Sequence, residues 1–442
     1  HSSPRAAPRL PFRDAVSIRT MRVSGRERIR IVRRRLARSR LFSLCVVLAV
    51  FSGTSRIAFD EDAIDLASRF FVFIGFGALR ATVDHAVGLR CVSCCRGARA
   101  LVRASPLVAK KNVACFSGRA RHKGDETRVV YNLLTRGVDP LNYGYLQRAH
   151  TFLTDVVESR AERCSGMSGV VASCRATKFE VVWALEDDAS VPRDVIEALR
   201  ARGIIVVAHS VPMERKDDGF TYVPNFHFIK YRGFESLIQR VLDQGVVMAR
   251  RESAVFWRGS TTGWSCSIDD AACDSRNGCA RLTRVRAVNT AWNAPWLDFR
   301  VTHLVQECAV SNRNFSLRTS GRAPELEWVR HKGILEVDGN VDAWGNRWRM
   351  ESGSVVFMVK SKFAHYYSDS LVDGVHYVGI SDDLSDLTER TRIVTDESAE
   401  NVAKLSRIAS NAARLMREKY TYDKVVVDVA DVLFAGNEPQ TQ

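Results

Sequence analysis

Residues 331–360, HKGILEVDGNVDAWGNRWRMESGSVVFMVK, restrict the fold of this chain more than any other segment. The apolar run that ends at Val337 predicts a buried strand, and a polar turn, Asp338-Gly339-Asn340, follows it. A short helix comes next, and the small residues Ser352-Gly353-Ser354 separate it from a second apolar run, residues 355–359. Strand, turn, helix and strand in this order form an α/β crossover unit, which predicts a parallel sheet covered by helices.

The same crossover predicts where a ligand binds. In parallel α/β sheets, ligands bind beyond the carboxyl ends of the strands, where free N–H groups at a helix N-terminus favour an anion. The predicted helix carries Arg347 and Arg349. Since the planar guanidinium group suits phosphate oxygens, the segment predicts a site for a phosphate-bearing ligand.

A second crossover lies nearer the N-terminus. Residues 179–185, FEVVWAL, predict a buried strand that ends in the acidic turn Glu186-Asp187-Asp188. Pro192 then opens a helix, and residues 204–208, IIVVA, predict the next strand. We therefore expect an α/β protein with a parallel sheet in this part as well. Further helices are predicted over residues 141–163, 234–248, 399–420 and 422–434.

The positive charge of the chain is concentrated at one end. The first forty residues contain thirteen arginines against Asp14 and Glu27, so they carry +11 of the net charge of +15. A basic arm of this kind can bind nucleic acid or an anionic membrane surface. Because no basic patch interleaved with aromatic residues occurs elsewhere, we expect no nucleic-acid partner.

The apolar run LFSLCVVLAVF, residues 41–51, follows the basic arm directly. A basic segment, a short apolar run and then small residues are typical of a secretory signal peptide or a signal anchor. The alternative is a disordered basic tail. A second short apolar stretch, residues 70–79, fits an interfacial element, a membrane-side segment or a core strand. We expect residues 1–56 to be tail plus signal or membrane anchor, and residues 57–125 to be an irregular stem.

The cysteines suggest an oxidising compartment. One of the eleven, Cys45, lies in the apolar run, which leaves an even number for disulfides. Cys91, Cys94 and Cys95 are clustered, but no second pair with zinc-site spacing follows, so we expect no metal. Asn314-Phe315-Ser316 is a glycosylation sequon, which can be used only in a luminal chain.

Three segments together resemble a known family. They are the crossover at 331–360, the run AVFWRGSTTG at 254–263, and HYV at 376–378 followed by DDLSDL at 382–387. In this order they resemble the nucleotide-sugar signature, the phosphate loop and the C-terminal motif of glycosyltransferase family 90. That family includes capsule-associated proteins and Rumi-like protein O-glucosyltransferases and xylosyltransferases. The likeness covers roughly residues 175–435.

The resemblance implies two Rossmann-like lobes that face a cleft, the GT-B architecture. The N-terminal acceptor lobe would span residues 126–240, and the C-terminal nucleotide-sugar lobe would span residues 241–435. The implied reaction is inverting transfer of glucose or xylose from a UDP-sugar to a hydroxyl of a protein or glycan, in the ER or Golgi lumen, with neither cofactor nor metal. The alternatives are a catalytically inactive relative that binds sugar or protein and, from the basic arm, a nucleic-acid-binding protein.

The resemblance also implies roles for single residues. Asp187 would be the catalytic base, although Asp188 or a solvated turn that only caps a helix remain alternatives. Arg347 would neutralise the leaving diphosphate. Further contacts to the nucleotide-sugar would come from two groups of residues: Arg258, Gly259, Ser260, Thr261 and Thr262 in the phosphate loop, and Asp338, Gly339, Ser352 and Ser354 in the crossover.

Overall fold

The computed structural model describes residues 95, 98, 102, 113–119, 128–133, 143–165, 178–185, 191–263, 278–310 and 316–435. All of them belong to one compact unit, residues 73–442. Asp187, Asp188, Asn314 and the apolar runs at 41–51 and 70–79 lie outside the described residues. Among the described residues, no helix has the length and the apolar character needed to cross a membrane.

The first sheet has the strand order β2-β1-β3-β4-β6. Its strands are β1 (Val113–Arg119), β2 (Arg128–Leu133), β3 (Lys178–Ala184), β4 (Ile205–Ala208) and β6 (Thr221–Tyr222). Strands β3 and β4 are parallel, as predicted, and β6 is parallel to β4, but β1 runs antiparallel to both β2 and β3. The sheet is therefore mixed, and β1 lies within residues 57–125, which the sequence analysis assigns to an irregular stem.

Helices on the first sheet confirm the predicted periodicities. Helix α5 (Tyr143–Ser165) buries Phe152, Leu153 and their neighbours in the same hydrophobic core as Trp183 of β3. Helix α6 (Arg193–Arg200) buries Val195, Ile196 and Leu199. The apolar spacing of 3 and 4 residues explains why each helix has one buried face.

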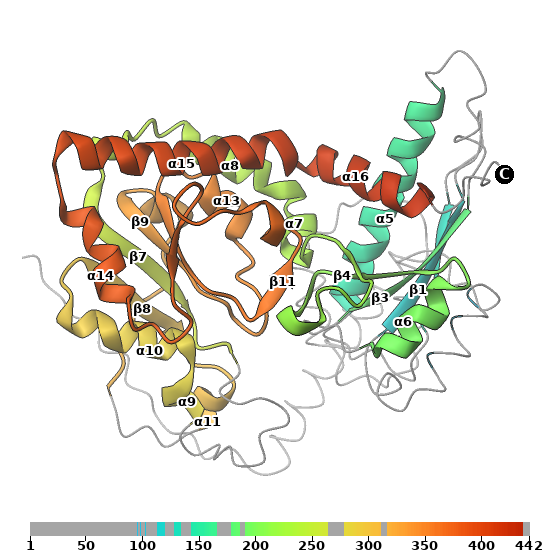
Figure 1. Cartoon of the computed structure of the whole chain (residues 1–442), viewed down its shortest axis with the longest axis horizontal. Helices are drawn as coiled ribbons and strands as arrows, with labels where there is room; N and C mark the ends of the chain where they lie inside the picture. The colour runs from blue at the N-terminus through green and yellow to red at the C-terminus, as the bar shows by residue number, and fades with distance from the viewer. Residues whose placement is uncertain are drawn as a thin grey trace, which may run out of the picture. The chain divides into compact units, whose positions relative to one another are not determined.

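The second sheet is entirely parallel, with the order β12-β10-β9-β7-β8. Its strands are β7 (Glu252–Ser260), β8 (Leu297–His303), β9 (His331–Glu336), β10 (Val355–Val359) and β12 (Val378–Ile380). Helices α10 (Thr283–Thr290) and α14 (Leu387–Thr391) lie on one side, and α13 (Asn346–Met350) and α15 (Ala399–Lys419) lie on the other (Figure 1). The mixed α/β class with parallel sheets flanked by helices is thus confirmed.

The order of these strands creates a switch point. The connection from β7 leads to β8 on one side, whereas the connection from β9 leads to β10 and β12 on the other side. Because β7 and β9 are neighbours, two connections leave adjacent strand ends in opposite directions. A crevice opens beyond such strand ends, and this is where ligands bind in sheets of this kind.

Contacts cross the predicted lobe boundary between residues 240 and 241. Helix α16 (Tyr422–Ala435) belongs to the predicted C-terminal lobe, yet it packs against α5. Tyr422 donates a hydrogen bond to Asp155 (2.7 Å), and Arg163 pairs with Asp431 (2.9 Å). A two-stranded sheet of β5 (Ser210–Pro212) and β11 (Phe363–His365) makes a second link.

The remaining elements are short. The predicted helix over residues 234–248 is only the eight-residue α8 (Glu235–Leu242). The others are η3 (Met213–Arg215), α7 (Phe226–Lys230), η4 (Arg232–Phe234), η5 (Met248–Arg250), α9 (Gly278–Arg281), η7 (Ala291–Asn293), α11 (Glu307–Val310), α12 (Glu325–Trp328), η8 (Ser368–Ser370) and η9 (Arg392–Thr395).

Candidate functional site

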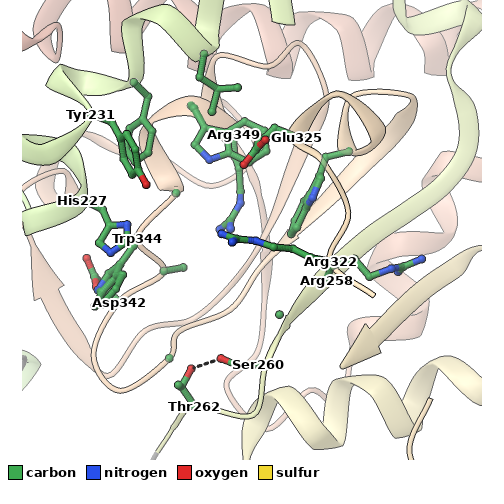
Figure 2. Close-up of a pocket in the computed structure, with 18 of the residues that line it drawn as sticks. His227, Tyr231, Arg258, Ser260, Thr262, Arg322, Glu325, Asp342, Trp344 and Arg349 are labelled. Atoms are coloured by element: carbon green, nitrogen blue, oxygen red, sulfur yellow. Dashed lines mark hydrogen bonds between the residues drawn. The ribbon is translucent and has the colours of Figure 1, made fainter. Parts of the chain in front are cut away.

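A cavity of about 1030 Å³ lies at the switch point, beyond the ends of β7 and β9 (Figure 2). Five residues predicted for the nucleotide-sugar line it: Arg258, Gly259, Ser260, Thr262 and Gly339. The structure therefore brings together the end of the predicted phosphate loop and the first turn of the crossover. Five further arginines line the same cavity: Arg232, Arg240, Arg284, Arg322 and Arg349.

Arg284 of α10 holds the two strand ends together. Its guanidinium donates to the hydroxyl of Thr262 (2.5 Å) and the carbonyl of Ser260 (3.3 Å) beyond β7. It also donates to the carbonyls of Asp338 (2.8 Å) and Val337 (3.1 Å) beyond β9. The sequence analysis missed this residue, because its helix lies far from both motifs along the chain.

The charge of Arg284 is not balanced by a direct partner. Among the described residues, no carboxylate lies within ion-pair distance of its guanidinium. Burial, followed by the nearby charge of Arg349, lowers its pKa to about 10, so it remains a cation at neutral pH. The charges of Asp338, Glu336 and Asp342 act in the opposite direction, but none of these carboxylates is bonded to the guanidinium. A partly buried cation without a directly bonded carboxylate favours an anionic ligand.

Gly339 allows the close approach of these segments. A Cβ atom at this position would lie 3.0 Å from the hydroxyl oxygen of Thr262 and 3.1 Å from Nη2 of Arg284. Any larger residue would push apart the groups that line the base of the cavity. A glycine next to hydroxyl and guanidinium groups is typical of a site where backbone approaches a phosphate.

Arg258 and Arg349 each have a carboxylate partner. Arg258 forms an ion pair with Asp298 of β8 and lies over the ring of Phe256, 4.1 Å from its centroid. Arg349 of α13 forms an ion pair with the buried Glu336 and lies 4.9 Å from the ring centroid of Trp328. These contacts fix the direction of both guanidinium groups at the edge of the cavity.

Arg347 does not line this cavity, although the resemblance implies a diphosphate role for it. Its side chain is 2% exposed, and its guanidinium pairs with Glu351 and donates to the carbonyl of Tyr420 (2.9 Å). Arg349 is two positions further along the same helix and faces the cavity instead. The guanidinium of Arg347 is thus committed to contacts inside the protein.

Ser352, Ser354 and Thr261 are also turned away from the cavity. The hydroxyl of Ser354 accepts from Arg251 (2.7 Å) and donates to the carbonyl of His331 (2.7 Å). Ser352 donates to the carbonyl of Arg349 (2.7 Å). Thr261 is fully buried and exchanges hydrogen bonds with the backbone of Val305. These hydroxyls hold turns in place.

Asp338 lines a smaller neighbouring cavity of about 440 Å³. Burial raises the pKa of this carboxyl to about 6, against the opposing effects of a hydrogen bond from Ser361 and of the charge of Arg284. Asp342 lines both cavities and accepts a hydrogen bond from Asn225 (2.8 Å). Among the described residues, no group of three histidine, cysteine or carboxylate side chains could hold a metal ion.

The side of the cavity across from Arg258 and Arg322 is aromatic (Figure 2). The rings of His227 and Trp344 are 3.9 Å apart between centroids, and those of His227 and Tyr231 are 5.9 Å apart. We call these three residues, His227, Tyr231 and Trp344, the aromatic wall. Their positions in the sequence give no common signal, since residues 227–231 and residue 344 meet only in the folded chain.

Comparison with known protein families decides the relationship. The model of glycosyl transferase family 90 matches residues 231–434. This part of the chain belongs to glycosyl transferase family 90. The match includes all three segments from the phosphate loop onward, whereas Asp187 precedes it. No curated protein sequence matches the chain. The chain thus carries a glycosyltransferase-family domain, which supports a transferase with a donor and an acceptor.

Proposed function

We propose that this protein is an inverting glycosyltransferase that moves glucose or xylose from a UDP-sugar to a hydroxyl of an acceptor. The observation that carries the proposal is the cavity at the switch point, where the guanidinium of Arg284 lies between two strand ends with no directly bonded carboxylate. A nucleoside diphosphate supplies the negative charge that such a site lacks. Membership of the family supports the same reaction class.

In this proposal, Arg284 and Arg349 neutralise the leaving diphosphate. Cleavage of the bond between sugar and phosphate builds negative charge on the phosphate oxygens, and fixed cations stabilise that charge most in a cavity shielded from water. Ser260 and Thr262 contact each other through their hydroxyls (3.4 Å) and line the same cavity, so they would donate to the phosphates. With two arginines in this role, the leaving group needs no metal ion.

The chemistry also requires a base for the acceptor. The acceptor hydroxyl attacks the anomeric carbon as the sugar–phosphate bond breaks, and its proton passes to a carboxylate. We propose Asp187 as that carboxylate, since only Leu185 and Glu186 separate it from the end of β3 in the sequence. The products are the inverted glycoside and UDP.

We further propose that the protein acts in the lumen of the ER or Golgi, with its N-terminal apolar run as signal or anchor. Two disulfides support an oxidising compartment: Cys95–Cys115 joins a residue before the first sheet to β1, and Cys279–Cys308 joins α9 to α11. In such a compartment the sequon at Asn314 would be available for glycosylation.

The test is a UDP-release assay on the full chain, produced in an oxidising host and supplied with a panel of UDP-sugars. Release from UDP-glucose or UDP-xylose, lost in Arg284→Ala and in Asp187→Asn, is the expected result. Asp188→Asn is the matched control, because it removes an adjacent carboxylate. Binding of UDP without turnover on any donor would favour an inactive relative, and absence of UDP binding would refute the proposal.

A further inference from the structure

The aromatic wall is a second recognition surface in the cavity. Tyr231 is 48% exposed and lines the cavity. One of its neighbours is Phe234, with the two ring centroids 5.4 Å apart. Nζ of Lys230 lies 5.3 Å from the centroid of the Tyr231 ring, and a ligand with an apolar face that covers the exposed part of this ring would gain stability.

The wall carries no net charge of its own. Burial and the charges of Arg148, Lys230 and Arg322 lower the pKa of His227 to about 3, so its imidazole is neutral in the physiological range. Within the part of the chain that the structure describes, the ring of His227 has no hydrogen-bond partner. A neutral imidazole can donate or accept a hydrogen bond, which suits hydroxyl groups better than phosphates.

The turn after Tyr231 holds the ring in place at a conformational cost. Arg232, Gly233 and Phe234 all have positive φ values, of 44°, 71° and 63°. A Cβ atom on Gly233 would lie 3.1 Å from the backbone nitrogen of Tyr422. Arg232 is held by an ion pair with Asp155 (3.0 Å). Backbone strain that the surrounding structure maintains in this way is concentrated at ligand sites.

The other half of the wall is fixed by Asn225. Its side-chain oxygen caps α7 by accepting from the backbone of His227 (3.1 Å) and Phe228 (2.9 Å). Its amide donates to Asp342, two residues before Trp344. The cap therefore sets the position of His227 against Trp344 and places a carboxylate beside the two rings. A ligand would meet rings and carboxylate already in position.

We propose that the aromatic wall binds a sugar ring of the acceptor, so that the acceptor of this enzyme is a glycan. A pyranose presents a face of C–H groups that packs on an aromatic ring, and hydroxyls at its edge that bind carboxylates and neutral imidazole. Asp342 and His227 provide those partners here. A single serine side chain of a protein acceptor has no face that would cover Tyr231.

The inference rests on the proposed function, because it assigns the donor to the cationic side of the cavity. The two sites are compatible in size. Ligand cavities of roughly 300–1,000 Å³ hold one drug-sized molecule. This cavity, at about 1030 Å³, is slightly larger than that range, and its arginine side and aromatic wall face each other (Figure 2).

Saturation-transfer NMR on the full chain tests the inference, with and without saturating UDP. The probes are maltotriose, cellotriose, xylotriose and mannotriose, and a serine-containing peptide is the competitor class. We expect at least one trisaccharide to bind through its ring protons. Tyr231→Ala should weaken that binding by about three- to tenfold, which is the size of an aromatic contact. Tyr231→Phe should retain it.

Trp292→Ala is the matched control, because Trp292 is also exposed (54%) but does not line the cavity. This variant should bind the trisaccharide like the parent. A chain that binds UDP but no trisaccharide, or one that binds the peptide instead, overturns the inference alone. Equal binding by the parent and Tyr231→Ala also overturns it. A chain that binds neither UDP nor glycan overturns the proposed function as well.

Discussion

Two arginine networks lie on opposite sides of the short helix α13. The cavity network is built on Arg284 and Arg349, and the buried network is built on Arg347 and Arg251. In the buried network, Arg347 is matched by Glu351, and Arg251 donates to the carbonyls of Val329, Val246 and Ser352 and to Ser354. In the cavity network, Arg284 meets only neutral oxygens.

The difference shows how the same residue type can serve the fold or the function. An ion pair buried away from the cavity, such as Arg347 and Glu351, cannot reach a ligand there, and removing one partner mainly changes stability. Arg349 is also paired, with Glu336, but its side chain lines the cavity. A cation held by carbonyls and hydroxyls at the edge of a cavity keeps its charge for an incoming anion. We therefore expect the buried network to control the free energy of unfolding and the cavity network to control turnover.

The largest expected effect is on stability, from Arg347→Ala. This change leaves the buried carboxyl of Glu351 without its main partner, and breaking such a pair costs about 3–5 kcal/mol. Urea unfolding measures the loss. The double variant Arg347→Met/Glu351→Leu should recover most of it, because no unpaired charge remains. Lost turnover with unchanged stability would instead make Arg347 the diphosphate ligand that the resemblance implies.

Arg284→Ala should show the opposite pattern. We expect UDP release to fall about 10²-fold in kcat/KM, since one charged donor to the transition state is removed. Arg286→Ala is the matched control on the same helix, because Arg286 is half-buried, does not line the cavity and donates to the backbone of Asp383. If both variants lost the same activity, α10 would act by positioning the loops and not through the charge of Arg284.

The sequence predicts the elements that depend on local interactions, and it misses those that depend on contacts between residues far apart in the chain. The apolar runs of β3, β4, β9 and β10 and the spacing of apolar residues in α15 were sufficient to predict those elements. In each case the local sequence shows which residues are buried. Strand β1, VACFSGR, mixes small and polar residues with apolar ones, and its partners are residues 128–133 and 178–184. Only the pairing with these distant segments identifies β1 as a strand, so the sequence analysis did not predict it.

The site follows the same rule. The resemblance implies a donor role for Arg258, Gly259, Ser260, Thr262 and Gly339, and the structure brings these five to one cavity because strand ends in parallel sheets share an edge. Arg347 and Arg349 are about 200° apart around a helix, so only one of them can face a given cavity. Which one does so depends on Glu351 and on the carbonyl of Tyr420, a residue beyond α15. No local pattern contains that information.

The buried His209 makes the stability of the fold depend on pH. His209 is buried at 3% exposure, and burial, with the charge of His365, lowers its pKa to about 4. The unfolded chain, with a pKa near 6.5, binds the proton first, so this stabilisation is full above pH 6.5 and is lost as pH falls toward 4. Between pH 7 and 5 the loss is about 2 kcal/mol for this group.

His209→Gln should therefore flatten the dependence of urea unfolding on pH between 7 and 5, without changing UDP release at pH 7. His209 does not line the cavity, whereas His227 does. A His227→Gln variant provides the contrast, since we expect it to alter acceptor binding as well. An unchanged pH profile in His209→Gln would show that other groups control the acid sensitivity.

The smallest effects come from two serines that the resemblance assigns to the same ligand. Ser354→Ala removes one of two acceptors from Nη1 of Arg251, which keeps its bond to the carbonyl of Val329, so we expect a loss of about 1 kcal/mol in unfolding free energy and no change in donor KM. Ser260→Ala should raise donor KM by about two- to fivefold and leave stability within about 0.5 kcal/mol. Each serine variant serves as the control for the other. If Ser354→Ala raised donor KM and Ser260→Ala lowered stability, the donor would lie beside the Ser352–Ser354 turn. The distinction between the two networks would then be wrong.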